Sequence, residues 1–540
     1  MFTNFKMTLL FSFFTLLNTQ NVYAATVENS RSGSNSYLFI ENNIDKEYFI
    51  TPDTLDPRFS GSNVWTKYKT NQESLGYMGF GTTRSNRYVD LWITNSPINS
   101  PFLGLRCRND GSNCPSSGYL SASVVDKEGF YHARSGASIA NGNQPYGLFS
   151  SSAFEFFRTQ GVGSSTKFVI NWCATNSSSY DYDFASGKRC KDLSDNEASW
   201  ETYTLTSTKL GHLSLESTGS LSEIWVASDG TPSVTENTAW CRTGIVGGSN
   251  GIICKMVSYK LEENKSINSL RFGMVIDTAQ LGFTPSSTDV KFSGASNVWF
   301  NWNTNSTKAQ DIFSSGNNFV EVFFSTSFFN KALQTGANLT GKDTLFTFNF
   351  RNTNTPQSGY YQFTASNQVN IVPKEYGISI VPTNGNSKPQ STGTIGSAEP
   401  IEFEYRVTTS ASRQADSITA QVVGESTLIN GTPYCLFVST DGSLSVPIPA
   451  YLSWTDKSGA IVNRRNSCVE QPIDMTSALW TQTPWNAAID NSFYFETLLK
   501  LKFPMNDSRS QFTTSGNDWL GTVSASGEIK MTATWIGVDK

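Results

Sequence analysis

Short segments in which apolar and polar residues alternate recur along the whole chain. Phe346, Phe348 and Phe350 are separated by polar residues, and residues 168–173 and 401–407 alternate in the same way. An alternation of period two is typical of antiparallel strands that bury one face. Dipeptides that favour turns, such as Asn-Gly and Asp-Gly, lie between these segments. Many short strands at this spacing predict an all-β protein built from tandem, Ig-like β-sandwiches.

Two segments are instead flanked by residues typical of the ends of short helices. Residues 153–157 and 328–333 are rich in Phe and Ala, and each follows a run of three hydroxyl residues. Hydroxyl side chains are favoured at helix N-caps. The glycines that follow, Gly161 and Gly336, are favoured at helix ends. We expect these two helices to interrupt an otherwise β-rich fold.

The chain is too long for one hydrophobic core, so several domains are expected. We divide it into 25–222, an N-terminal sandwich, 223–374, a middle sandwich, and 375–540, a C-terminal domain. The segment Val381–Pro400 is rich in Pro, Gly, Ser and Thr. It is either a linker between domains or a long loop just inside the last one.

Residues 1–24 have the order of a secretory signal peptide. Lys6 ends a short basic start, Met7–Leu17 is apolar, and Val22-Tyr23-Ala24 supplies small residues at a cleavage site. This order predicts export and cleavage after Ala24. No later segment resembles a membrane span, so we expect a protein that is soluble or held by its partners.

The eight cysteines fall into neighbouring pairs. An exported chain meets an oxidising compartment, where such spacing favours disulfides. The spacing does not fix the connectivity, but each pair brackets a Gly/Asn/Ser-rich segment that suits a turn. Zinc is disfavoured because no C-x-x-C occurs and the chain has only two histidines. The expected pairs are Cys107 with Cys114, Cys173 with Cys190, Cys241 with Cys254, and Cys435 with Cys468.

Composition and motifs argue against several classes of function. Charged residues make up 16% of the chain, the net charge is −5, and no Lys/Arg cluster marks a surface for nucleic acid or anionic membrane. The G-x-S-x-G string at 247–251 has no helix after it, so we interpret it as a hairpin loop. We therefore expect no enzyme, no cofactor and no metal. A glycosidase that uses two distant carboxylates remains an alternative.

Two groups of aromatic residues are candidate binding residues. Trp65 and Tyr68 lie close together in sequence, as do Trp299 and Trp302. Rings on one exposed face stack on the apolar face of a sugar, and nearby Asn side chains then contact its hydroxyls. Since aromatic residues are mostly buried, an ordinary core role is the competing interpretation.

The end of the chain alternates clearly. Ile529, Met531, Ala533 and Trp535 are separated by Lys530 and two threonines. An apolar-faced strand at the end of a chain suits pairing with another polypeptide, because main-chain hydrogen bonds give affinity and alternate pockets fix the register. An ordinary last strand of a closed sandwich has the same pattern.

The strings around these features resemble a known family. Asn517–Ile529 and Ala533-Thr534-Trp535 resemble the pilin domains of the Escherichia coli common pilus. The region 241–257 is also similar to the CblD-like tip adhesins of colonisation-factor pili. Further strings resemble the tip adhesin of the common pilus: Ser74–Tyr77, Asn95–Pro97, Gly104–Cys107, Gly187–Asp192, Cys254–Val257, Ser358–Tyr361 and Thr483–Trp485.

The resemblance implies a fimbrial tip adhesin assembled by the chaperone-usher pathway. Its C-terminal pilin domain would be an incomplete Ig-like fold, completed by donor-strand complementation. The implied partners are a periplasmic chaperone, an outer-membrane usher, a major pilin subunit, and a receptor, for which the aromatic groups favour a glycan. Residues 25–36 are polar, without the apolar alternation of a donor strand, which agrees with a tip position. The alternatives are a pilus adaptor or shaft subunit without a receptor, and a secreted carbohydrate-active β-protein.

Overall fold

The computed structural model describes most of the chain between Ala24 and Gly537. The signal peptide predicted for residues 1–24 lies outside the described residues except for Ala24 itself. The described residues are 24–54, 58–70, 72–79, 86–107, 114–135, 146–177, 180, 188–227, 230–234, 240–294, 298–304, 307–335, 344–386, 388–484 and 492–537.

These residues form two compact units that are almost entirely β-structure, so the all-β prediction is confirmed. The first unit takes in the chain up to Ser36 together with Asp56–Gln160 and Ser164–Thr208. The second takes in Tyr37–Leu55, Gly161–Gly163 and everything from Lys209 onward. Two long strands, β1 (Val27–Asn42) and β14 (Ala198–Glu216), contribute residues to both units. Among the described residues, no helix is long and apolar enough to cross a bilayer.

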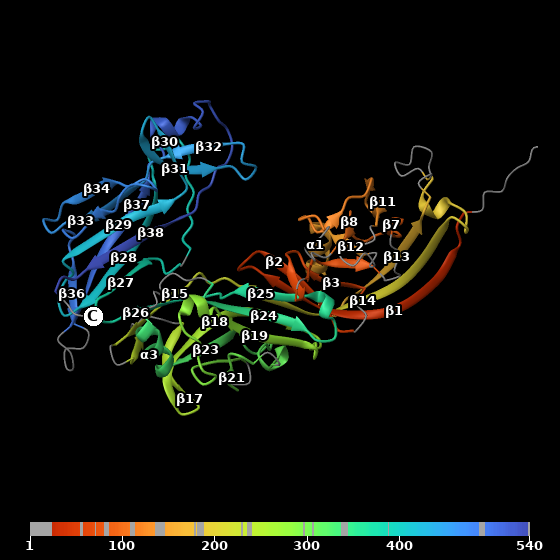
Figure 1. Cartoon of the computed structure of the whole chain (residues 1–540), viewed down its shortest axis with the longest axis horizontal. Coiled ribbons are helices and arrows are strands. Elements are labelled where there is room, and N and C mark those ends of the chain that lie inside the picture. The colour runs from red at the N-terminus through yellow and green to blue at the C-terminus, as the bar shows by residue number, and fades with distance from the viewer. Residues whose placement is uncertain are drawn as a thin grey trace, which may run out of the picture. The chain divides into compact units, whose positions relative to one another are not determined.

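The first unit contains two antiparallel sheets (Figure 1). One has the order β10-β11-β7-β13-β14, and the other has the order β3-β6-β12-β8-β9. Apart from β1 and β14, its elements are β3 (Phe59–Ser62), β4 (Thr66–Lys69), β5 (Gln72–Ser74), β6 (Tyr77–Gly79), β7 (Tyr88–Ile93), β8 (Phe102–Arg106), β9 (Tyr119–Leu120), β10 (Val124–Val125), β11 (Gly129–Arg134), β12 (Tyr146–Phe149), α1 (Ser151–Thr159), β13 (Ser165–Thr175) and η2 (Cys190–Asp192).

Helix α1 links these two sheets through its aromatic side chains. The ring of Phe157 stacks on that of Phe59 of β3, with 4.8 Å between the ring centroids. The centroid of the Phe168 ring on β13 lies 6.0 Å from that of Phe157. Ser150 caps the helix by accepting a hydrogen bond from the Ala153 amide, which is the N-cap predicted from the sequence. Both predicted helices are confirmed as α1 and α3.

The second unit begins with a sandwich in which Phe side chains meet between two sheets. Phe272 of β19 contacts Phe292 of β20 at 5.6 Å and Phe348 of β24 at 5.7 Å. The elements are β2 (Glu47–Pro52), β15 (Leu221–Val226), β16 (Pro232–Val234), β17 (Cys241–Val246), β18 (Ser249–Glu263), β19 (Leu270–Ile276), α2 (Thr278–Leu281), β20 (Val290–Ser293), β21 (Phe300–Asn301), β22 (Thr307–Lys308), η3 (Ala309–Asp311), β23 (Phe319–Ser325), α3 (Thr326–Thr335), β24 (Phe346–Asn352), η4 (Pro356–Ser358), β25 (Tyr360–Thr364) and β26 (Gln368–Pro373).

The G-x-S-x-G string is a tight hairpin turn, as predicted. It joins β17 to β18, and Gly247 and Gly248 occupy the turn with φ of +58° and +82°. Two consecutive positive φ values are typical of a two-residue turn that only glycine-like residues adopt easily. The string therefore does not form the strand-to-helix turn of a nucleophile elbow.

A second sandwich occupies the end of the chain. One sheet has the order β27-β28-β37-β33-β34, and the facing sheet has the order β35-β29-β38 (Figure 1). The elements are β27 (Gly377–Pro382), β28 (Ile401–Ala411), β29 (Ser417–Gly424), β30 (Ser426–Ile429), β31 (Thr432–Val438), β32 (Ser445–Ile448), β33 (Tyr451–Thr455), β34 (Ile461–Arg465), β35 (Ile473–Asp474), β36 (Thr481–Pro484), β37 (Phe493–Phe503), η5 (Ser508–Gln511) and β38 (Gly527–Thr534).

The Pro/Gly-rich segment 381–400 connects two paired strands of this sandwich. β27 pairs with β28 from Gly377↔Ser410 to Pro382↔Tyr405. Because both strands belong to one sheet, most of the segment is a long loop inside the last domain and does not link two domains.

Four disulfides join each cysteine to its nearest neighbour in sequence. Cys241 and Cys254 lie directly opposite each other on β17 and β18. The bonds are Cys107–Cys114, Cys173–Cys190, Cys241–Cys254 and Cys435–Cys468. Each closes a short loop, so each restricts the unfolded chain locally.

One half-buried carboxyl makes stability depend on pH. Burial, together with the neighbouring Asp45 carboxylate and against a hydrogen bond with Tyr361, raises the pKa of Glu47 to about 7. Since the folded protein binds this proton more tightly than the unfolded chain, the stabilisation is complete below about pH 4.5. It is lost as the pH rises through about 7.

We expect Glu47→Gln to flatten this dependence. The amide mimics the protonated acid. Between pH 5 and pH 8, the melting temperature of the variant should therefore fall on the order of several degrees less than that of the unmodified chain. Thermal unfolding at a series of pH values measures the difference. Glu399→Gln, in an exposed loop, is the matched control. Equal slopes for Glu47→Gln and the unmodified chain would show that Glu47 is not the group responsible.

Candidate binding edge of the C-terminal sandwich

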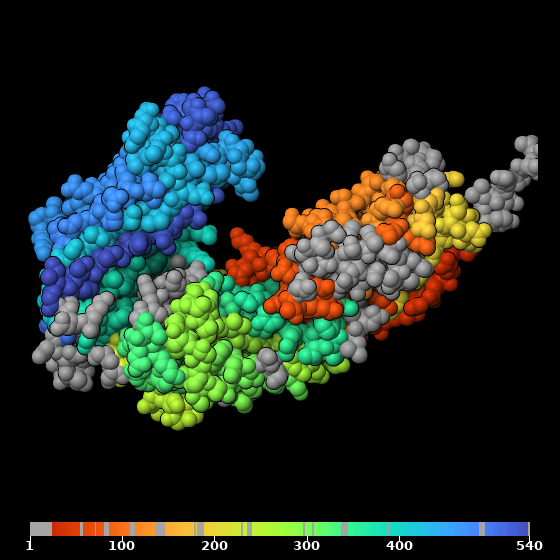
Figure 2. Space-filling view, in the orientation of Figure 1, coloured from red at the N-terminus to blue at the C-terminus, as the bar shows by residue number. Residues whose placement is uncertain are grey.

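The last strand, β38, lies at the end of its sheet. It pairs with β29 from Gly527↔Gly424 to Thr534↔Ser417, and no described strand pairs with its other side. The side chains of Ile529, Met531 and Ala533 point into the sandwich but are only half-buried. In Figure 2 the end of the chain, in the darkest blue, lies open on the surface.

The backbone of the same three residues faces the open side. On β29 the N–H groups of Ile418 and Val422 point away from β38. They donate to the side chains of Thr476 and Asn466. In an antiparallel pair, residues directly opposite each other alternate between hydrogen-bonded and non-hydrogen-bonded pairs. Ile418 and Val422 pair with Ala533 and Ile529. The N–H and C=O groups of Ile529, Met531 and Ala533 therefore point to the unpaired edge.

Strand β27 presents a matching edge on the facing sheet. Its only strand partner among the described residues is β28, and the Thr383 amide just beyond it donates to Glu404 O at 3.0 Å. Hydrogen-bonded and non-hydrogen-bonded positions alternate along the strand, starting from that bond. The N–H and C=O groups of Ile378 and Ile380 therefore point to the open side, while their side chains contact the core. Pro382, which has no N–H, falls at another such position, where a ladder hydrogen bond is not lost.

Between these edges the core is only partly covered. Residues at its centre, such as Leu452, Leu499 and Ile418, are fully buried. The half-buried residues packed against it are Ile378, Ile380, Phe403, Tyr405, Phe437, Val462, Ile473, Trp480, Phe503, Ile529, Met531, Ala533 and Trp535. Those on β27 and β38 are half-buried although they face inward, and neither strand has a partner on its open side among the described residues.

The two edges meet at one end through aromatic and polar contacts. The rings of Tyr376 and Trp535 lie 5.5 Å apart, edge to face. Trp535 Nε1 donates to Arg413 O at 3.1 Å, and Arg413 in turn donates to Ile536 O at 2.7 Å. The Ile536 amide donates to Asp416, and that bond, together with Arg413, lowers the pKa of the Asp416 carboxyl. These contacts fix the end of β38 and leave the rest of its edge open.

The opposite face of β27 is also covered. The Ser379 hydroxyl donates to the Glu223 carboxylate of β15, and Arg406 of β28 forms an ion pair with the same carboxylate at 3.1 Å. Glu223 is 4% exposed. The strand is therefore held by contacts on both faces while its edge stays unpaired.

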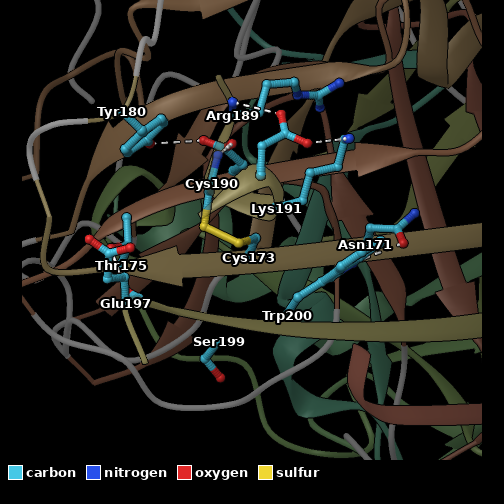
Figure 3. The surroundings of a disulfide bond; sticks show 12 residues. Asn171, Cys173, Thr175, Tyr180, Arg189, Cys190, Lys191, Glu197, Ser199 and Trp200 are labelled. Carbon is cyan, nitrogen blue, oxygen red and sulfur yellow. Dashed lines mark hydrogen bonds and ion pairs between the residues drawn. A yellow bond between two sulfur atoms is a disulfide. The ribbon is translucent and has the colours of Figure 1, made fainter. Parts of the chain in front are cut away.

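A separate buried cluster surrounds the Cys173–Cys190 disulfide in the first unit (Figure 3). The fully buried Asp90 accepts hydrogen bonds from the His132 amide, the Tyr180 hydroxyl and the Cys190 amide at 2.8, 3.0 and 3.1 Å. Burial raises the pKa of Asp90 despite these bonds. The carboxyl thus ties the disulfide-bearing segment to the sheet. It was not predicted from the sequence, where a single acid within the apolar strand 88–93 was the only signal.

The four aromatic candidates for receptor binding are half-buried and lie in different units. Trp65 and Tyr68 belong to the first unit, and Trp299 and Trp302 belong to the second. Trp65 Nε1 donates to Ser116 O at 3.3 Å, and Trp302 Nε1 donates to Ser286 O at 3.2 Å. Trp299 packs on Phe323, their ring centroids 6.2 Å apart. The four residues thus form two separate candidate pairs, one in each unit, and their role in binding stays a prediction.

An all-β chain whose last sandwich carries two open strand edges over a half-covered core has the architecture of a pilus subunit. Models of the E. coli common pilus adhesin EcpD match residues 24–213 with its N-terminal domain, 217–368 with its middle domain and 375–533 with its C-terminal domain. The Fimbria adhesin EcpD of E. coli O6:H1 (strain CFT073) is 36% identical over 526 residues, which cover 93% of each chain. The same protein of strain K12 matches equally.

The chain therefore belongs to the E. coli common pilus adhesin family. It is a fimbrial adhesin, exported to the cell surface. A chaperone–tip adhesin complex of CFA/I fimbriae is among the similar solved structures, at 10% identity and a TM-score of 0.19, covering 60% of this chain and 98% of that chain. A likeness at that level adds nothing to the assignment.

Hydrogen exchange tests the alternation along β38. We expect the amides of Ile529 and Ala533 to exchange at least about tenfold faster than those of Lys530 and Thr532, which face β29. Exchange followed by mass spectrometry with residue-resolved fragmentation measures the rates. Equal protection of neighbouring residues would show that the edge is covered or that the register differs.

Proposed function

We propose that this chain attaches a pilus to a surface receptor and joins the pilus through donor-strand complementation of its C-terminal sandwich. The observation that carries this proposal is the pair of open edges on β27 and β38. Each edge presents unpaired backbone groups from residues whose apolar side chains line the gap. A strand inserted there gains hydrogen bonds on both sides and buries alternate side chains in the core.

The partners follow from the same geometry. An apolar edge left open aggregates with other edges, so it must be covered from the moment the domain folds. A periplasmic chaperone would lend the first strand, and an outer-membrane usher would accept that complex. The N-terminal extension of the next subunit, the major pilin, would then replace the lent strand.

Receptor binding falls to the domains before the pilin domain. We propose that residues 25–222 and 223–374 act as two β-sandwich modules, that residues 375–540 act as the pilin module, and that none of them is an enzyme. Trp65, Tyr68, Trp299 and Trp302 are the candidate contacts to a glycan. Their half-buried rings leave one face or edge for a ligand while the rest is held by packing.

Two neighbouring substitutions test strand insertion. Met531→Glu places a charge inside the acceptor gap, and we expect it to weaken binding of the cognate pilin's N-terminal peptide by about 100-fold or more. Lys530→Glu, whose side chain points to solvent, should change binding by less than about threefold. Titration of the full-length mature chain with the peptide, followed by calorimetry, measures both. Equal effects of the two substitutions would contradict insertion of the peptide against the inward face of β38.

A glycan array tests the adhesive role. The full-length mature chain, complemented with the donor peptide, should give a specific signal that falls at least about tenfold in either Trp65→Ala/Tyr68→Ala or Trp299→Ala/Trp302→Ala. Loss in one double variant and not in the other would assign the site to one module. Absence of any signal would favour an adaptor subunit without a glycan receptor. Release of sugar, lost on mutating an acid pair, would favour a carbohydrate-active protein.

A further inference from the structure

The predicted cleavage point coincides with a boundary of burial. Ala24 is exposed, whereas the next residue, Ala25, is 4% exposed. Strand β1 begins two residues further on, at Val27. The chain thus passes from solvent into the first unit at the peptide bond where the leader is expected to be removed.

Ala25 is packed into the cluster around the Cys173–Cys190 disulfide. Its methyl group shares this cluster with Trp92, Tyr131 and both half-cystines, and the cluster also holds Tyr180, Leu193 and Ala198. The Ala25 nitrogen donates to the Lys191 carbonyl at 3.1 Å. Lys191 lies in the single turn η2, directly after Cys190. The start of the mature chain therefore contacts the segment that the disulfide holds.

A carboxylate binds the next residue along the chain. Asp195 Oδ1 accepts from the Thr26 amide at 2.6 Å and from the Thr26 hydroxyl at 3.0 Å. Glu28 accepts from the Ser199 hydroxyl on β14. The side chains of Thr26 and Glu28 are thus both bonded to one short segment, residues 191–199.

We propose that the α-amino group freed by leader removal is a built-in ligand of the first unit, which docks on the Lys191 carbonyl near Asp195 and strengthens this contact after export. Hydrolysis of the Ala24–Ala25 peptide bond consumes one water and leaves a carboxylate on Ala24 and an ammonium on Ala25. The ammonium has three N–H donors where the peptide nitrogen had one. Hydrogen bonds from a charged donor are roughly twice as strong as neutral ones.

The two chemical events of the oxidising compartment meet at this cluster. Oxidation closes the Cys173–Cys190 loop, whose end supplies the Lys191 carbonyl. Leader removal supplies the cation that binds there. Neither Lys191 nor Asp195 can contribute an equally strong contact to a chain that still carries its leader, because the peptide-linked nitrogen is neutral.

Amine labelling tests the docking. The full-length mature chain, purified from the periplasm with its chaperone, is treated with an amine-acylating reagent near neutral pH, and modification of Ala25 is followed by peptide mass spectrometry. The comparison chain carries Gly-Ser-Gly inserted between Ala24 and Ala25, so that its amino group lies away from Lys191. We expect the native N-terminus to be labelled about tenfold more slowly, the protection that a charge-assisted hydrogen bond of ordinary net strength gives.

Substitutions of acids separate docking from general burial. Asp195→Asn should raise the labelling rate of Ala25 several-fold, whereas Glu73→Gln, an exposed acid of the first unit, should leave it unchanged. If the inserted chain does not accumulate, the comparison of these two variants with the unmodified chain decides alone. Labelling at the rate of the inserted chain, indifference to Asp195→Asn, or a mature chain that begins at another residue would overturn the proposal.

Discussion

The unpaired backbone of two strand edges is the constraint on which this molecule depends. N–H and C=O groups in a half-covered apolar gap are costly unless they find partners, and a sheet edge supplies its own template for another strand. In the C-terminal sandwich both edges present these groups from residues whose side chains also face the core, Ile378 and Ile380 on β27 and Ile529 to Ala533 on β38. One inserted strand therefore satisfies both requirements at once.

Contacts at one end and on the opposite face hold these edges in place. The Tyr376–Trp535 contact and the Arg413–Asp416 pair fix one end of the gap, and Glu223 holds β27 from its other face. These contacts hold the edges in register without pairing them. Asp416 and Arg413 are largely exposed, so their ion pair adds little energy by itself. Their main effect is positional, through the Trp535 indole and the backbone N–H and C=O of Ile536.

Local patterns predicted the elements that are fixed by local rules. The alternation at 168–173, 346–350 and 401–407, the N-cap at Ser150 and the Gly247–Gly248 turn all depend on period, capping or φ alone. The inward face of β38 was predicted in the same way, but β27 as the second edge was not. Its role arises from pairing with β28 across a long loop, which no local signal encodes. Asp90 was missed for the same reason, since its three donors come from distant segments.

The start of the chain complements its end. A polar segment at 25–36 predicted only that no apolar donor strand is present, whereas the structure shows Ala25 buried and Thr26 and Glu28 bonded to residues 195 and 199. A segment held in this way would first have to break those bonds before it could insert into another subunit. The two ends thus differ in kind: the C-terminal sandwich has two strand edges without a partner among the described residues, whereas the N-terminal segment is bonded to its own unit.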